Sequence, residues 1–88
     1  MAAYRGEVAT RARRDLERLA PALVERLGQA LMALRDDPRP RSSEKLVGID
    51  AYRIRVGDYR VIYDIDDRTR VVIVSRIRHR REVYRKLR

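Results

Sequence analysis

The 88-residue sequence contains no cysteine and a single histidine, His79. Without thiols the chain can form neither a disulfide framework nor a thiolate metal site, and one histidine cannot build a zinc centre. No apolar run approaches the roughly 18 residues that a membrane span needs, and the N-terminus lacks the apolar stretch of a signal peptide. These absences predict one small domain, residues 1–88, in a reducing cytoplasm, with no cofactor and no membrane partner.

Two further classes of site are missing. The four glycines, at positions 6, 28, 48 and 57, form neither a GxGxxG fingerprint nor a phosphate-binding P-loop. No pair of carboxylates occurs in a setting that suggests a glycosidase or a two-metal nuclease. Metal-free chemistry on a phosphodiester is still compatible with the sequence.

Basic side chains, in contrast, are abundant and unevenly distributed. The chain has 22 lysines and arginines against 13 acidic residues, a net charge of +9, and only Lys45 and Lys86 are lysines. Residues 53–88 hold 12 of the basic and 5 of the acidic side chains. A positive field attracts polyanions, of which nucleic acid is the commonest in a cytoplasm. An arginine-rich coding bias would explain the choice of arginine over lysine but not this concentration, so we place the function in the second half.

The first half of the chain is typical of a short strand followed by two helices. Residues 3–9 can form the strand, and Thr10 can be the N-cap of a helix with apolar residues at positions 12, 16 and 19. Pro21 suits the first turn of a second helix, which should end at residues 36–38. The two helices form an antiparallel pair that needs another apolar surface to cover. The apolar stripe of the second helix consists of Leu23, Leu27, Ala30, Leu31 and Leu34.

Three strands in the second half supply that surface. Alternating or β-branched segments cover residues 51–56, 59–65 and 70–77, with turns at 57–58 and 66–69. Gly57 as the first central residue of a two-residue loop favours a type II′ turn, which places Arg55 opposite Arg60. We therefore expect an α+β domain in which two N-terminal helices pack on a small antiparallel sheet. The inward face of the first hairpin should carry Tyr52, Ile54, Val56, Tyr59, Val61, Tyr63 and Ile65.

The outward face of this hairpin should carry Arg53, Arg55 and Arg60, together with Ile62 and Asp64. Like charges directly opposite each other destabilise an antiparallel pair by up to about 1 kcal/mol, so a repeated cluster calls for a compensating anion. Guanidinium groups bind phosphate oxygens bidentately, which makes this face a candidate phosphate site. The alternative is a solvated face on which long side chains splay apart. Because the arginines oppose rather than follow one another, we favour the phosphate site.

The final segment, "SRIRHRREVYRKLR", adds further basic groups around one aromatic residue, Tyr84. If the third strand continues to residue 80, every second side chain from 76 to 80 is an arginine, and Val83 and Leu87 would anchor a short terminal helix. Tyr84 can stack a base, act as a general base or anchor that helix. His79 is expected at the surface, although a pKa near ~6.5 also allows proton transfer. The residues expected to bind RNA are Arg76, Arg78, His79, Arg81 and Arg85.

The segments "YRIRVGDYRVIYDI" and "RHRREVYR" together resemble the RelE/ParE superfamily of bacterial toxin–antitoxin toxins, and RelE-type mRNA interferases more closely. The resemblance extends over nearly the whole chain through "RDLERL", "DDPRP" and "KLVG". It implies a toxin that a cognate antitoxin neutralises and that cuts mRNA in the ribosomal A site by attack of the ribose 2′-hydroxyl on the adjacent phosphate. The catalytic residues that it implies are Arg53, Arg55, Arg60, Arg80 and Tyr84, with Arg78 and Arg81 as alternatives to Arg80.

Two of these positions depart from the best-known members, which have lysines where this chain has Arg53 and Arg55. The pKa of arginine exceeds ~12, so neither side chain can give up a proton near neutral pH. Both can stabilise a pentacovalent dianion, which leaves Tyr84 or His79 as the general base. Competing functions are a ParE-like poison of DNA gyrase, a class that typically does not keep Arg80 with the tyrosine, and a non-catalytic RNA-binding module.

Overall fold

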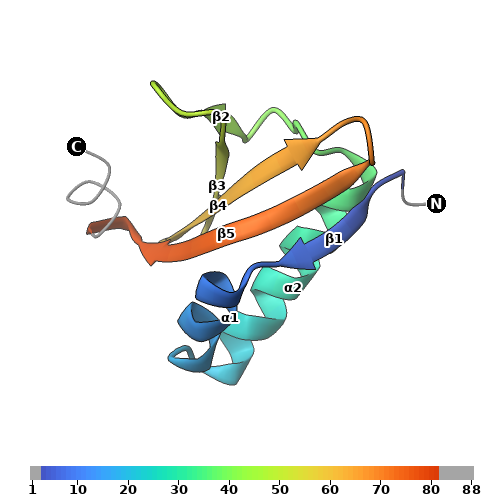
Figure 1. The fold of residues 1–88 in the computed structure, drawn as a ribbon. Coiled ribbons are helices and arrows are strands. Elements are labelled where there is room, and N and C mark those ends of the chain that lie inside the picture. Colours follow the sequence, from blue (N-terminus) through green and yellow to red (C-terminus); the bar gives the residue numbers. More distant parts are fainter. Residues whose placement is uncertain (1–2, 82–88) are drawn as a thin grey trace.

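Two helices lie on one face of a five-stranded sheet in the computed structural model, which describes residues 3–81 (Figure 1). The expected α+β class is confirmed. The expected helix at residues 83–87 lies outside the described residues. The helices are α1 (Thr10–Glu17) and α2 (Pro21–Asp36), and the strands are β1 (Arg5–Val8), β2 (Glu44–Lys45), β3 (Tyr52–Val56), β4 (Tyr59–Asp66) and β5 (Val71–His79).

The sheet is mixed, which corrects the expectation of a purely antiparallel one. Its strand order is β1-β5-β4-β3-β2, and β3, β4 and β5 form the predicted antiparallel meander. β2 adds a two-residue pairing beside β3. β1 runs parallel to β5, with Arg5 opposite Val71 and Val8 opposite Val74. Sequence periodicity could not predict this pairing, because both helices and three strands separate the two partners along the chain.

The ends of the helices follow local chemistry, with one correction. α2 begins at Pro21, where the missing N–H of proline costs no intrahelical hydrogen bond. Thr10 is not the N-cap of α1 but its first helical residue; Ala9, in extended conformation, takes the N-cap position and makes no side-chain hydrogen bond. Among the described residues no helix is both long and apolar enough to cross a bilayer.

The β3–β4 hairpin has the predicted register. Gly57 has a φ of 60°, as the first central residue of a type II′ turn requires and as residues with a side chain rarely adopt. The turn therefore places Arg55 directly opposite Arg60. The observed pairs are Tyr52–Tyr63, Arg53–Ile62, Ile54–Val61, Arg55–Arg60 and Val56–Tyr59.

A β-bulge interrupts the pairing between β4 and β5. The register shifts by one residue between Ile62 and Tyr63, which leaves Ser75 as the additional residue of β5. The Ser75 hydroxyl donates a hydrogen bond to the Ile62 carbonyl at 3.1 Å. Because successive side chains of a strand point to opposite faces, one inserted residue exchanges the faces of everything beyond it.

The bulge decides where the arginines of β5 point. Val72, before the bulge, and Ile77, after it, both pack in the core, although strict alternation would place them on opposite faces. Arg78 consequently lies on the face away from the helices, beside Arg60. Without the bulge, the residues that share a face with Val72 would include Arg76 and Arg78. The insertion therefore keeps two charges out of the core.

The core lies between the helices and the inward face of the sheet, as the apolar patterns predicted. Tyr63 is completely buried, and its hydroxyl donates a hydrogen bond to the Pro38 carbonyl at 2.8 Å. This contact ties the loop after α2 to the centre of the sheet. The buried core residues are Ala12, Leu27, Leu34, Ile54, Val56, Val61, Tyr63, Val72, Val74 and Ile77.

Candidate functional site

Three arginines lie side by side on the outer face of the sheet, which the helices leave uncovered (Figure 1). Arg60, on the central strand β4, pairs with Arg55 of β3 on one side and with Arg78 of β5 on the other. Neighbouring strands are about 4.8 Å apart, so the three residues form a row about 10 Å wide. We call Arg55, Arg60 and Arg78 the arginine row. Sequence reasoning predicted its first pair, and the bulge in β5 adds the third member.

Arg60 is the buried member of the arginine row, a feature that was not predicted from the alternation of the strand. Only 4% of its surface is exposed, whereas Arg55 is exposed and Arg78 is half-buried. Ile62, the next outward residue of β4, is also buried. Arg60 and Ile62 are buried because they lie on the central strand β4, where the long side chains of β3 and β5 flank them on either side.

The Arg60 guanidinium has no hydrogen bond or ion pair to another side chain within residues 3–81. Such a mostly buried cation without a counter-ion costs stability, because burial removes much of its hydration without replacing it. Asp64 shares the face of Arg60, but four residues along a strand amount to about 13 Å. The centre of the arginine row is therefore a candidate binding site for an anion from outside the chain.

Two of the predicted arginines have carboxylate partners. Arg53 Nη2 lies 3.1 Å from Glu44 Oε2, because the β2–β3 pairing places these residues opposite each other. Arg76 Nε lies 3.0 Å from Asp15 Oδ2 of α1. Sequence reasoning missed both carboxylates, since each contact depends on the tertiary arrangement rather than on local spacing. The charges of Arg53 and Arg76 are consequently partly offset within the chain.

His79 lies at the end of β5 and faces the other side of the sheet. It pairs with Tyr59, and the two rings meet edge to face with centroids 5.3 Å apart. The Arg81 backbone N–H donates a hydrogen bond to His79 Nδ1 at 3.4 Å. Because His79 follows Arg78 directly in the strand, its ring points away from the face that carries Arg60. The other candidate base, Tyr84, lies outside the described residues.

Arg80 lies just beyond β5, which ends at His79. The expected alternation of arginines at positions 76, 78 and 80 of the strand therefore does not reach Arg80. Its backbone N–H donates to the Asp58 carbonyl at 2.8 Å, and its side chain is exposed. Of the alternatives for the last arginine of the site, Arg78 is the one that the sheet places next to Arg60. Arg85 lies outside the described residues.

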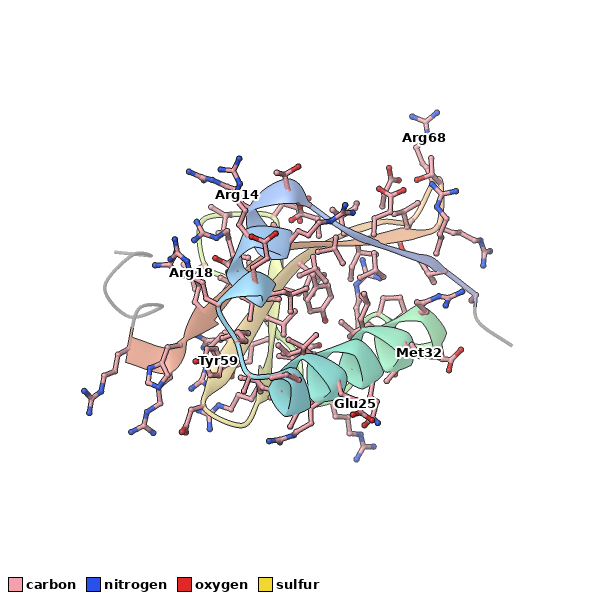
Figure 2. The ribbon with its side chains drawn as sticks, turned by 90° about the horizontal axis from the view of Figure 1, so that it is seen from below. Arg14, Arg18, Glu25, Met32, Tyr59 and Arg68 are labelled. Atoms are coloured by element: carbon pink, nitrogen blue, oxygen red, sulfur yellow. The ribbon has the colours of Figure 1, made fainter. Side chains whose placement is uncertain are left out.

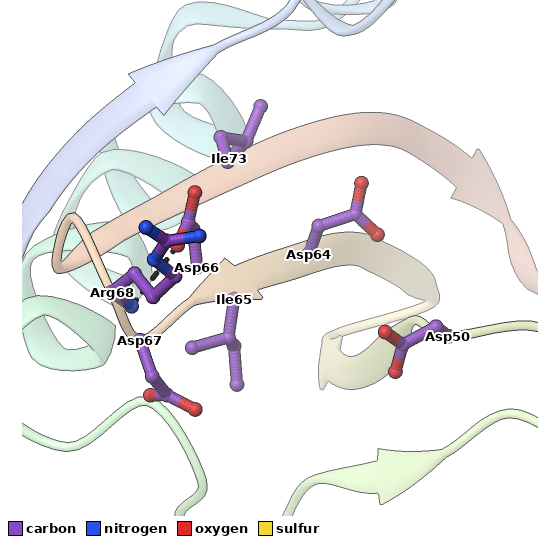
Figure 3. A pocket seen from close by; sticks show the side chains of 7 residues that line it. All are labelled: Asp50, Asp64, Ile65, Asp66, Asp67, Arg68 and Ile73. Atoms are coloured by element: carbon purple, nitrogen blue, oxygen red, sulfur yellow. Dashed lines mark hydrogen bonds between the residues drawn. The ribbon is translucent and has the colours of Figure 1, made fainter.

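The other end of the sheet is acidic (Figure 3). Asp64 and Asp66 of β4, together with Asp50 and Asp67, line a hollow of about 480 Å³. Within residues 3–81 no three His, Cys, Asp or Glu side chains are arranged to hold a metal ion. A polyanion that approaches the sheet is therefore attracted to the end with the arginine row and repelled from this end.

Hydrogen bonds and burial shift the acidic groups of this end in opposite directions. The side chains of Arg39 and Tyr4 donate to Asp67 and lower the pKa of its carboxyl. Burial raises the pKa of Asp64, and the nearby Asp50 adds to the rise, although the side chain still has substantial exposed surface. The pKa values of Asp64 and Asp67, which lie three residues apart on the chain, are thus shifted in opposite directions.

Comparison with known proteins gives concordant matches in sequence and in structure. Residues 7–84 match the family model described as the ParE toxin of the type II toxin–antitoxin system parDE. Toxin RelG of Mycobacterium tuberculosis is 34% identical over 88 residues, an alignment that covers 94% of this chain and 98% of RelG.

Two solved toxin–antitoxin complexes contain chains with this fold. The archaeal RelE–RelB complex from Pyrococcus horikoshii OT3 matches with a TM-score of 0.79 and 31% identity, covering 89% of this chain and 96% of the matched chain. The intact RelBE complex of E. coli matches with a TM-score of 0.75 and 29% identity, covering 85% and 94%.

Proposed function

The chain belongs to the ParE toxin family of type II toxin–antitoxin systems, and on this premise we propose that it is a RelE-like endoribonuclease that cuts mRNA in the ribosomal A site. The observation that carries the proposal is the arginine row, in which buried Arg60 lies between two further arginines. Keeping an uncompensated cation at the centre of a sheet lowers stability. An anion that binds there, such as the phosphate of an RNA strand, explains why the chain retains it.

The reaction needs no nucleophile from the protein. The ribose 2′-oxygen attacks the adjacent phosphorus as its proton passes to a base, and the bond to the 5′-oxygen of the next nucleotide breaks. The 5′-oxygen takes up a proton, and the products are a 2′,3′-cyclic phosphate and a 5′-hydroxyl end. Because the nucleophile is part of the RNA, no metal-bound water is required.

Arg60 stabilises the charge that develops on the phosphoryl oxygens, and Arg55 and Arg78 donate from either side. A donor that is already in place when the charge develops lowers the barrier without reorganisation, and one such donor contributes about 10²–10³-fold. Arg53 supports the row from the next position along β3, with its charge partly offset by Glu44. Tyr84 is the base in this proposal, because His79 belongs to the opposite face of the sheet.

The cognate partner in this proposal is an antitoxin, as in the RelE–RelB complexes that this chain resembles. A partly disordered acidic segment can fold on binding and cover an arginine-rich face. Co-expression of the adjacent gene should relieve growth inhibition that this chain causes when expressed alone.

A ribosome-programmed cleavage assay tests the proposal. The protein is added to translating ribosomes with one defined mRNA, and the ends of the fragments are analysed. We expect cleavage within the A-site codon that leaves 2′,3′-cyclic phosphate and 5′-hydroxyl ends, and no comparable cleavage of the same mRNA without ribosomes. Intact mRNA on ribosomes that carry the bound protein would instead support a non-catalytic RNA-binding module.

Inhibition of DNA gyrase is the second candidate, because the matching family model is described as a ParE toxin. Purified gyrase with plasmid DNA and ATP distinguishes the two functions. The endoribonuclease proposal expects supercoiling at the control rate with this protein present. Loss of supercoiling together with intact mRNA would favour the gyrase poison.

A further inference from the structure

Among the described strands none pairs with the edge of β5 beyond β1, and α1 lies against this edge instead. β1 ends at Val8, opposite Val74, so its pairing does not extend to the last part of β5. The Asp15 carboxylate of α1 fills the gap, accepting hydrogen bonds from the Ile77 backbone N–H at 2.9 Å and from Arg76 Nε at 3.0 Å. The helix is thereby fixed against the end of the strand that carries Arg78.

A hollow of about 450 Å³ lies at this junction, and it is mostly polar. Arg18, at the C-terminal end of α1, lines one side, and the end of β5 lines the other. Asp15 is the only carboxylate among the described lining residues, and Arg76 already neutralises it. The hollow therefore has an excess of positive charge. Its lining residues are Asp15, Arg18, Leu19, Tyr59, Arg76, Ile77, Arg78 and His79.

Arg18 is exposed and forms no side-chain hydrogen bond or ion pair within the described part of the chain. Figure 2 shows Arg14 and Arg18 projecting from the same side of α1, with Arg18 nearer to the end of β5. Arg14 is equally charged and exposed but does not line the hollow. The two residues therefore differ in position rather than in chemistry.

We propose that this hollow is a second phosphate-binding subsite for RNA, with Arg18 as its principal ligand. Arg78 belongs both to the arginine row and to the lining of the hollow, so the two positive regions are continuous across the edge of β5. Phosphates recur at every nucleotide, so a strand held with one phosphate at Arg60 can place a neighbouring phosphate over this edge. The subsite deepens the proposed function, since it concerns how the same RNA is held.

Binding of a short, fully 2′-O-methylated single-stranded oligoribonucleotide tests the subsite. This probe lacks the attacking hydroxyl, so its affinity is measured without cleavage. For Arg18→Gln we expect binding about fivefold weaker at low salt. The slope of log affinity against log salt should become shallower by about 0.7, the value for one lost phosphate contact on a single strand. Arg18→Lys keeps the charge and should retain most of the affinity.

Arg14→Gln is the matched control, because it removes the same charge from the same helix outside the hollow. It should leave the affinity and the salt slope close to those of the parent. Equal effects of Arg14→Gln and Arg18→Gln would overturn the proposed subsite, because they would show that the oligonucleotide responds only to the overall positive charge of the protein. Failure of the parent protein to bind the oligonucleotide would also overturn the proposal. This binding test can fail while the proposed function holds, because the cleavage assay with the parent protein does not depend on the role of Arg18.

Discussion

At Arg60 the demand of stability conflicts with that of the proposed function. The side chain is 4% exposed and has arginines as cross-strand neighbours on both sides. A chain selected for stability alone would place an apolar residue there. The stability cost of the buried charge is therefore a measurable consequence of the proposed function.

Replacing Arg60 with methionine should raise the free energy of unfolding while abolishing most cleavage. Methionine keeps an unbranched apolar stem and removes the unpaired charge, and such replacements of buried ionic groups can stabilise by about 1–4 kcal/mol. Urea unfolding measures the change, with Arg55→Met as the control at an exposed position of the same row. A lower stability for Arg60→Met than for the parent would mean that the guanidinium has a compensating partner.

The two aspartates with shifted pKa values predict opposite effects of acid. The pKa of Asp67 is lowered in the folded state, so the unfolded chain binds the proton first and the contribution of Asp67 to stability is lost as the pH falls below about 4, toward the lowered pKa. The pKa of Asp64 is raised, so the folded state binds the proton first and gains stability as the pH falls from the raised pKa toward about 4. Asp67→Asn should make the loss of stability on acidification shallower, and Asp64→Asn should make it steeper. Unfolding curves at several pH values between about 5 and 3 measure both, and a shift in the same direction for the two variants would contradict these assignments.

At the scale of elements, the sequence predicts what local spacing controls. The β3–β4 register follows from period-two alternation and from Gly57, both of which lie within a few residues of the pairs that they determine. The insertion at Ser75 has no comparable signal, because a bulge depends on how β5 meets β4. The parallel pairing of β1 and the carboxylates that bind Arg53 and Arg76 were missed for the same reason. For the candidate site, the pair Arg55–Arg60 was therefore predictable, whereas the place of Arg78 beside it was not.

The packing of α2 on the sheet can be tested with two residues of that helix. Leu27 is buried at 5% exposure and Met32 is 63% exposed. Leu27→Ala should lower the free energy of unfolding by about 2–5 kcal/mol, because it removes buried methyl groups and leaves a cavity. Met32→Ala should change it by no more than about 0.5 kcal/mol. Thermal unfolding of both variants measures the difference, and an unchanged melting curve for Leu27→Ala would show that α2 does not pack as described.

At the scale of the whole molecule, the sheet separates its charges. One end of β4 carries the arginine row and the other carries the acidic hollow, while the helices cover the remaining face. A polyanion is thereby attracted to one end of the outer face and repelled from the other. The fold contributes a rigid sheet that holds three guanidinium-bearing residues in one row, and the proposed cleavage of RNA is a reaction that such a row can promote.

The most direct test of this account is the rate at which Arg60→Ala cuts a defined mRNA in the ribosomal A site under single-turnover conditions. Arg68→Ala, at the acidic end of the sheet, serves as the control for loss of one arginine. The account predicts a rate about 10²–10³-fold below that of the parent for Arg60→Ala, since one preorganised donor to the transition state is lost, and a parental rate for Arg68→Ala. A folded Arg60→Ala variant that cuts mRNA as fast as the parent would contradict the assignment of the arginine row as the catalytic site.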